Sequence, residues 1–197
     1  FDDLFSALAG VKAEYCCTLS HLSFSENYIN HDFITFLSKC TSLKSLFFNE
    51  SLAINMDCIE AFSQMISKMK LPVLQTLSLR GNLELKRCLY QNFVPLCKAL
   101  RQSRSLEKLD VSNNNIGDEG IDELCEFFTT PHDDDEDQNE HAGDSRNHNK
   151  KLTELSFDNC YVQNMEPLIK LVDRGLSTGR TILLDYPTQE VYRLKTT

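Results

Sequence analysis

The sequence predicts an α/β solenoid, a right-handed horseshoe of stacked strand–helix units with parallel strands on the concave side and helices outside. One segment carries leucines at fixed spacing, its first half recurs four more times, and a stretch with helical periodicity follows each copy. We expect about five repeats and an N-terminal helix, all in one domain over residues 1–197.

The opening segment, FDDLFSALA over residues 1–9, predicts an amphipathic helix before the first strand. Such a helix covers the end of a stack that would otherwise expose its core. Because this helical pattern begins at Phe1 without an initiator methionine, we expect the chain to be a segment of a longer protein.

The strongest copy of the repeat is LEKLDVSNNNIGDEGIDEL, residues 106–124. Its first half recurs at Leu19, Leu43, Leu74 and Leu152. Positions one, four and six of each copy are leucine, phenylalanine or valine, which the alternation of a strand directs into one core. The residues between them point outward. The copy at Leu43 is expected to slip by one residue, so that Ile54 takes the apolar place at position eleven.

Position nine of each copy carries a short side chain that can bond to backbone groups where the chain turns. Stacking these turns predicts a ladder of such residues along the solenoid. Its members are Asn27, Ser51, Asn82, Asn114 and Cys160.

A helical stretch follows each strand, with apolar residues spaced near 3.6 residues apart. We expect these residues to form the outer half of the core. They are Phe33, Phe36, Leu37, Cys40, Ile59, Phe62, Ile66, Phe93, Leu96, Cys97, Leu100, Ile121, Leu124, Cys125, Phe128, Leu168, Ile169 and Val172.

The copies begin 24, 31, 32 and 46 residues apart, whereas units of this kind run about 20–29 residues. The longer steps therefore require longer helices or inserted loops. The largest insert is the polar stretch 131–149, which holds seven acids and one base and contributes −6 of the formal charge of −9. With almost no apolar residue to bury, it is expected to be a flexible loop.

Two roles of the acidic insert stay open: a solvated spacer, or a contact for a basic partner such as a histone tail. The second role would use Asp133, Asp134, Asp135, Glu136 and Asp137. A calcium site is not supported, because the D-x-D-x-D-G spacing with a distal glutamate is missing. We expect no metal site.

The segment from Leu106 to Leu124 resembles the ribonuclease-inhibitor subtype of leucine-rich repeat, with Gly120 and Leu124 at its characteristic positions. The resemblance extends over about residues 19–172 and departs from the pattern at Phe33 and Glu166, where the family has glycine. It implies a protein-protein interaction module or scaffold that needs no cofactor and is not an enzyme.

The resemblance also implies that partners bind the concave strand face. On that face Phe47 and Arg80 are expected to be the main contacts, because aromatic and arginine side chains often anchor interfaces. Phe47 could instead mark a register shift or contact a neighbouring side chain, and Arg80 could be solvated or pair with Asp110. Rim contacts are expected from Lys108, Asp110, Glu154 and Asp158.

Composition indicates where the protein is located and which kinds of partner it binds. Eight cysteines without a C-x-x-C pair favour reduced core thiols and an intracellular location, cytoplasmic or nuclear. No apolar run is long enough for a membrane span. Outside the insert the chain is only mildly acidic, which argues against nucleic-acid binding. The alternatives are a GTPase-activating role that uses Arg80, and a structural spacer or dimerisation element.

Overall fold

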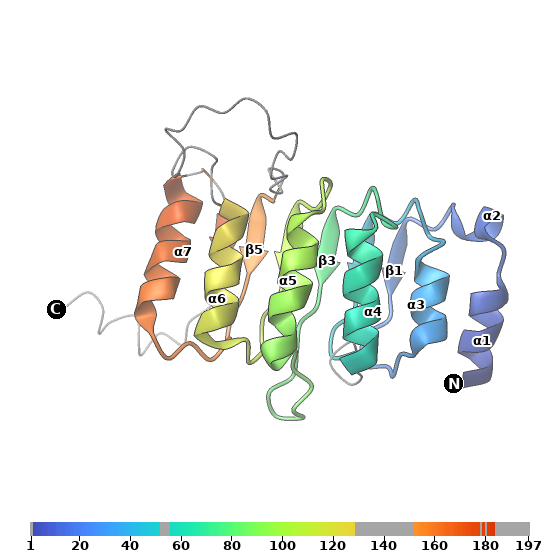
Figure 1. Cartoon of the computed structure of the whole chain (residues 1–197), viewed down its shortest axis with the longest axis horizontal. Coiled ribbons are helices and arrows are strands. Elements are labelled where there is room, and N and C mark those ends of the chain that lie inside the picture. Colours follow the sequence, from blue (N-terminus) through green and yellow to red (C-terminus); the bar gives the residue numbers. More distant parts are fainter. Residues whose placement is uncertain (1, 52–55, 129–151, 178, 180, 184–197) are drawn as a thin grey trace, which may run out of the picture.

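The computed structural model describes residues 2–51, 56–128, 152–177, 179 and 181–183, and it has the predicted solenoid architecture (Figure 1). Three-residue strands form one parallel six-stranded sheet whose strand order follows the chain, β1-β2-β3-β4-β5-β6. The helices form a second layer on one side of the sheet. The strands are β1 His21–Ser23, β2 Ser45–Phe47, β3 Thr76–Ser78, β4 Lys108–Asp110, β5 Glu154–Ser156 and β6 Thr181–Leu183.

The helices run side by side along the stack (Figure 1). Their bounds are α1 Asp2–Gly10, α2 Ala13–Cys16, α3 His31–Leu37, α4 Met56–Ser67, α5 Phe93–Arg101, α6 Gly117–Cys125 and α7 Met165–Ser177. Two 3-10 turns, η2 Tyr90–Asn92 and η3 Glu126–Phe128, adjoin α5 and α6.

The strand half of the repeat is in the predicted register. Leu46, Leu77 and Leu109 face one another across neighbouring strands and are buried. In the repeat at Leu43, positions one, four and six are buried as Leu43, Leu46 and Phe48, and the slip expected further along falls on residues that the structure does not describe. Ile54 lies outside the described residues. A sixth strand, β6, extends the sheet beyond the five expected repeats.

The position-nine ladder forms in three of the five repeats. Ser51 Oγ donates to the Phe24 carbonyl at 2.7 Å, and Asn114 Nδ2 donates to the Leu79 carbonyl at 2.8 Å. Cys160 Sγ lies 3.5 Å from the Val111 carbonyl. Each of these contacts ties a repeat to the one before it. Asn82 differs: its amide turns outward, where it donates to Glu50 at 3.0 Å and accepts from the backbone N–H of Leu85.

The residue at position eight adopts left-handed backbone in four repeats, a feature not predicted from the sequence. Its φ is 60° at Glu26, 59° at Glu50, 56° at Asn113 and 52° at Asn159. Asparagine tolerates this region better than most residues, so the two asparagines were an available signal. In the third repeat this place is held by Gly81. An added Cβ there would lie 2.5 Å from both the Asn113 carbonyl and the Asn114 amide oxygen.

The helices bury most of the residues predicted to be core, with one clear exception in α7. Ile169 is 52% exposed, and Val172 is only half-buried. The inward face of α7 is instead Pro167, Leu168, Leu171 and Gly175. Gly175 packs closely against β6 there, because an added Cβ would lie 2.0 Å from Cδ1 of Ile182, which would have to shift. The prediction that Ile169 is buried is therefore wrong: within the described part of the chain, α6 lies beside one flank of α7 and no helix lies beside the other (Figure 1).

The long repeat spacings have visible causes in two units. In the unit from Leu43, α4 extends over 12 residues. In the unit from Leu74, a loop closed by paired backbone hydrogen bonds between Asn82 and Arg87 projects from the edge of the solenoid (Figure 1). The acidic insert, with Asp133, Asp134, Asp135, Glu136 and Asp137, lies outside the described residues.

The N-terminal helix covers the first repeat as predicted. Phe5 of α1 is fully buried, and its ring meets that of Phe33 edge-on with centroids 5.4 Å apart. Lys39 Nζ donates to the carbonyls of Ala9 and Val11 at the end of α1. Aromatic packing and the hydrogen bonds of Lys39 therefore attach α1 to this end of the stack.

Ion pairs link three successive helices on the outer face. Glu123 of α6 lies 3.3 Å from Lys98 and 3.5 Å from Arg101 of α5. Glu126 of η3 continues the chain, with Arg101 at 3.5 Å and Arg174 of α7 at 3.6 Å. Because these groups are partly exposed, the pairs orient the helices more than they stabilise the fold.

Candidate functional site

The outward side chains of β1–β5 form a surface that we call the strand face. It comprises positions three, five and seven of the repeats, and the strand register places positions three and five of neighbouring repeats directly side by side. Its residues are His21, Ser23, Ser25, Ser45, Phe47, Asn49, Thr76, Ser78, Arg80, Lys108, Asp110, Ser112, Glu154, Ser156 and Asp158. Most are small and polar.

Phe47 is the large apolar side chain on this face. It aligns with Ser23 on one side and Ser78 on the other, so the alternative of a register shift is wrong. The ring is 37% exposed. Both aligned neighbours are serines, and one of them, Ser78, is itself buried.

Arg80 extends from the end of β3 and is exposed. With the Asn113 amide turned so that its oxygen faces the guanidinium, Arg80 donates to it through Nε at 2.9 Å and Nη2 at 3.1 Å. The alternative pairing with Asp110 does not form among the described contacts. Asp110 accepts instead from Ser78 Oγ at 3.2 Å and from the backbone N–H of Ser112 at 3.0 Å. Arg80 is therefore held in position by a neutral amide, and no carboxylate of the described residues forms an ion pair with it.

The four rim residues lie together on β4 and β5 and just beyond them. Lys108 Nζ and Glu154 Oε2 form an ion pair at 2.7 Å. The backbone N–H of Asp158 donates to Ser112 Oγ at 3.2 Å, and its carbonyl accepts from Asn113. Lys108 and Glu154 thus largely neutralise one another. Phe47 ends β2, and Arg80 follows the end of the neighbouring strand β3.

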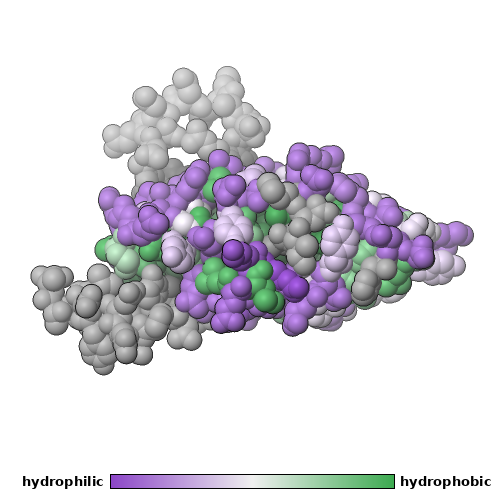
Figure 2. Space-filling view, turned by 90° about the horizontal axis from the view of Figure 1, so that it is seen from below, coloured by the Kyte–Doolittle hydropathy of each residue, from purple (hydrophilic) through white to green (hydrophobic). Residues whose placement is uncertain are grey.

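Exposed apolar residues at the edge of the solenoid were not anticipated from the sequence. Leu85 in the projecting loop is 59% exposed, and Tyr161 is 64% exposed. Figure 2, which views the molecule from below, shows hydrophobic patches that are separated by hydrophilic atoms. They form no continuous apolar surface on this side, so we assign them no site.

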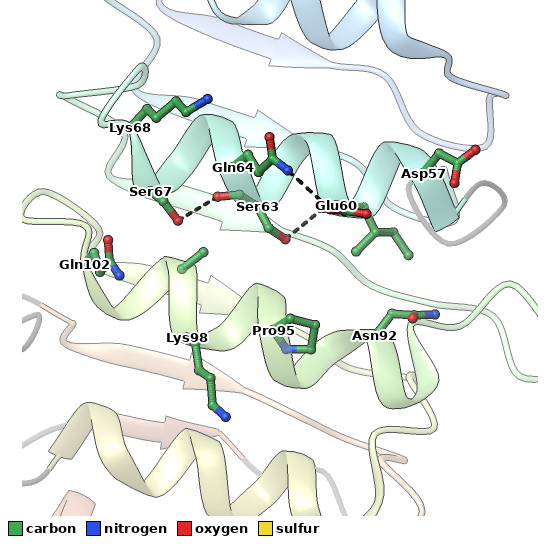
Figure 3. Close-up of a pocket in the computed structure, with 12 residues that line it drawn as sticks. Asp57, Glu60, Ser63, Gln64, Ser67, Lys68, Asn92, Pro95, Lys98 and Gln102 are labelled. Carbon is green, nitrogen blue, oxygen red and sulfur yellow. Dashed lines mark hydrogen bonds between the residues drawn. The ribbon is translucent and has the colours of Figure 1, made fainter.

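A groove of about 580 Å³ between α4 and α5 was also unforeseen (Figure 3). Small side chains, Ser63, Ser67 and Ala99, leave the space between the helices. Both serines donate their hydroxyls within α4, to the carbonyls of Ile59 and Ser63. The two serine hydroxyls that line the groove are therefore already hydrogen-bonded within α4, and we assign the groove no role.

The cysteines are packing residues in this structure. All eight are free, and only Cys17 is exposed. Burial raises the pKa of the Cys40 thiol to about 12 and that of Cys58 to about 11, which keeps both thiols protonated and unreactive at neutral pH. Among the described residues, no group of three or more histidine, cysteine or acidic side chains is placed to hold a metal ion.

Comparison with known proteins adds one finding. A family model described as Leucine Rich repeat matches residues 102–125, which contain β4 and α6 of the strongest repeat. No curated protein matches the chain. Within the described part of the chain, each helix is too short or too polar to cross a membrane.

Proposed function

Because the chain is a leucine-rich-repeat protein, we propose that it binds a protein partner through the strand face, with Phe47 and Arg80 as the main contacts. Leucine-rich repeats generally serve as protein-protein interaction modules. The observation that carries the proposal is the exposed ring of Phe47 on a surface of small polar side chains.

The spacing of the two residues specifies what a partner must offer. Phe47 aligns with Ser78 at the end of β3, and Arg80 follows Ser78 by two residues, which places the Cα atoms of Phe47 and Arg80 about 8 Å apart. A matching partner has an apolar pocket for the ring and, at that spacing, a carboxylate for the guanidinium. Asn113 holds the guanidinium in place, which lowers the entropy lost on binding.

Capture of partners from the native cell extract tests this proposal. We expect Phe47→Ala and Arg80→Glu each to reduce retention of the same partner at least about tenfold, as hot-spot residues do. Tyr15→Ala and Lys12→Glu are the matched controls, since both residues are exposed in or beside α2 at the N-terminal end of the stack, outside the repeats that carry Phe47 and Arg80. If both strand-face variants keep every partner that the wild-type chain captures, the assignment of this face is wrong.

The acidic insert is a second contact under this proposal. Seven acids within residues 131–149 would favour a basic segment of the partner. Deletion of residues 131–149 should then weaken capture and reduce its sensitivity to salt. If the deletion leaves both unchanged, the insert is a spacer.

We further propose that binding, and not catalysis, is the role of the chain in a reducing compartment, the cytoplasm or the nucleus. Leucine-rich repeats are typically non-enzymatic. Eight free cysteines, seven of them buried, support a reducing compartment. The modest charge outside the insert supports a protein partner over nucleic acid.

A further inference from the structure

We propose that the edge of the solenoid at the C-terminal ends of the helices binds an acidic protein segment that also carries apolar side chains. The turns that lead from a helix into the next strand form this edge, which lies opposite the projecting loop (Figure 1). We call it the turn edge, and its three central turns are residues 38–44, 68–75 and 102–107. It is separate from Phe47 and Arg80, so the inference goes beyond the proposed function.

Cations prevail in these three turns, although the whole chain is acidic. Glu107 is their one acid, and Lys39 is engaged with the carbonyls at the end of α1. Within the described part of the chain, the remaining cations are exposed and form no ion pair; they are Lys44, Lys68, Lys70 and Arg104. A helix end favours cations in its last turn, which does not account for Lys44 and Arg104.

Met69 lies between two of these cations, in a backbone conformation that disfavours methionine. Its φ is 53°, in the left-handed region where glycine usually ends a helix. Two hydrogen bonds fix the turn: the N–H of Met69 donates to the Ile66 carbonyl at 2.8 Å, and that of Lys70 donates to the Met65 carbonyl at 3.2 Å. The Met69 side chain is 47% exposed. An apolar side chain that is both strained and half in water favours a role in binding.

Hydrogen bonds bring the three turns side by side. The Lys44 carbonyl accepts from the N–H of Gln75 at 2.8 Å, which joins the first turn to the second. Ser105 Oγ donates to the Leu74 carbonyl at 2.8 Å, which joins the third turn to the second. Val73 is 38% exposed in the second turn. It therefore has, on each side, a turn that carries an exposed cation.

An acidic segment with apolar side chains complements this surface. Its carboxylates would pair with the lysines and the arginine, and its apolar groups would cover Met69 and Val73, the first of which adapts readily to different shapes. Nucleic acid is a poorer match, because the net charge of −9 repels a long polyanion and two apolar side chains add nothing to contacts with phosphates.

Selection from a random peptide library displayed on phage, with the full chain as bait, tests the proposal. Peptides that bind the wild-type chain are passed over the variant Lys68→Glu with Lys70→Glu, which removes those that bind elsewhere, the strand face included. We expect the remaining peptides to be enriched in aspartate and glutamate together with apolar residues. No enrichment, or enrichment of basic or uncharged peptides, would overturn the proposal.

Fluorescence anisotropy of one enriched peptide, labelled with fluorescein, then measures the contribution of the neighbouring turns. Lys44→Glu with Arg104→Glu should raise the Kd at least about tenfold, and the effect should shrink at high salt. Lys86→Glu with Lys170→Glu makes the same charge change at two exposed lysines away from the turn edge and should leave the Kd unchanged. Equal effects of the two double variants would mean that only net charge matters, which contradicts a local site.

Met69→Gly separates binding from folding. Because glycine is favoured at this φ, the thermal midpoint should stay the same or rise, whereas loss of the apolar side chain should raise the Kd about tenfold. Leu85→Gly, at an exposed leucine of the projecting loop, is the control and should bind as the wild-type chain does.

Two results of these measurements would refute the assignment of an acidic protein segment. One is a Kd that Met69→Gly does not change. The other is displacement of the labelled peptide by a DNA oligonucleotide, or by vesicles of phosphatidylserine, as effectively as by the unlabelled peptide. Phe47→Ala should leave peptide binding intact, whether or not the strand face binds a partner, so failure of either proposal can be told from failure of the other.

Discussion

Asn114 tests whether the position-nine ladder stabilises the solenoid. The side chain is fully buried. Its Nδ2 donates to the carbonyls of Leu79 at 2.8 Å and Val111 at 2.9 Å, and its Oδ1 accepts from the backbone N–H of Leu89 at 3.0 Å. One amide therefore satisfies backbone groups in two repeats.

Replacing Asn114 with alanine removes these three bonds and leaves buried backbone groups without their partner. At about 1 kcal/mol net for each bond, and more for each buried group left unsatisfied, we expect the free energy of unfolding to fall by about 3–5 kcal/mol. For a chain of this size a loss of 3 kcal/mol lowers the thermal midpoint by roughly 6–12 °C.

Urea unfolding followed by circular dichroism at the helix band measures this loss, since the chain has no tryptophan. Asn82→Ala is the matched control: it is the same residue at the same repeat position, but its half-buried amide bonds outward to Glu50. We expect it to cost about 1 kcal/mol or less, because water replaces such bonds. Equal losses in the two variants would refute the ladder as the source of stability.

Three further predictions concern close packing and the buried thiols. Gly81→Ala should destabilise the fold by at least about 2 kcal/mol, because the added methyl meets backbone and the Asn114 amide, whereas Gly10→Ala, which has open space, should be neutral or stabilising in thermal melts. A thiol-reactive dye should label Cys17 rapidly and the seven buried cysteines only after unfolding. Because the folded pKa of Cys40 is about 12 against 9.0 as its ordinary value, the free energy of unfolding should fall as pH rises from 9 toward 12. Stability unchanged over that window, or rapid labelling of several cysteines, would contradict the burial.

The strand half of the repeat was predictable because two constraints coincide there. The alternation of a strand fixes which residues point inward, and Leu46, Leu77 and Leu109 leave no other register that buries them. The same register determines the positions of the outward residues. Because Leu46 aligns with Leu77, Phe47 lies beside Ser78 on the outward face.

Helix orientation was less predictable, as Ile169 shows. α7 has apolar residues on two adjoining sides, and periodicity alone cannot say which side meets the sheet. The answer depends on Gly175, which brings the helix close to Ile182. The hydrogen bonds between Arg80 and Asn113 could not be predicted either. Asn113 belongs to the next repeat, and the two residues meet only when the repeats stack. Both cases depend on contacts between segments distant in the sequence.

The order of the strands has a consequence for how such a surface evolves. Neighbours across the strand face, such as Phe47 and Ser78, are separated by 31 residues in the chain, and Lys108 and Glu154 by 46, yet the register between them is unbroken. Length can therefore be added or lost in a connecting segment without disturbing the pattern of side chains. Single substitutions at outward positions can therefore change the surface one residue at a time, while the leucines of the core stay the same.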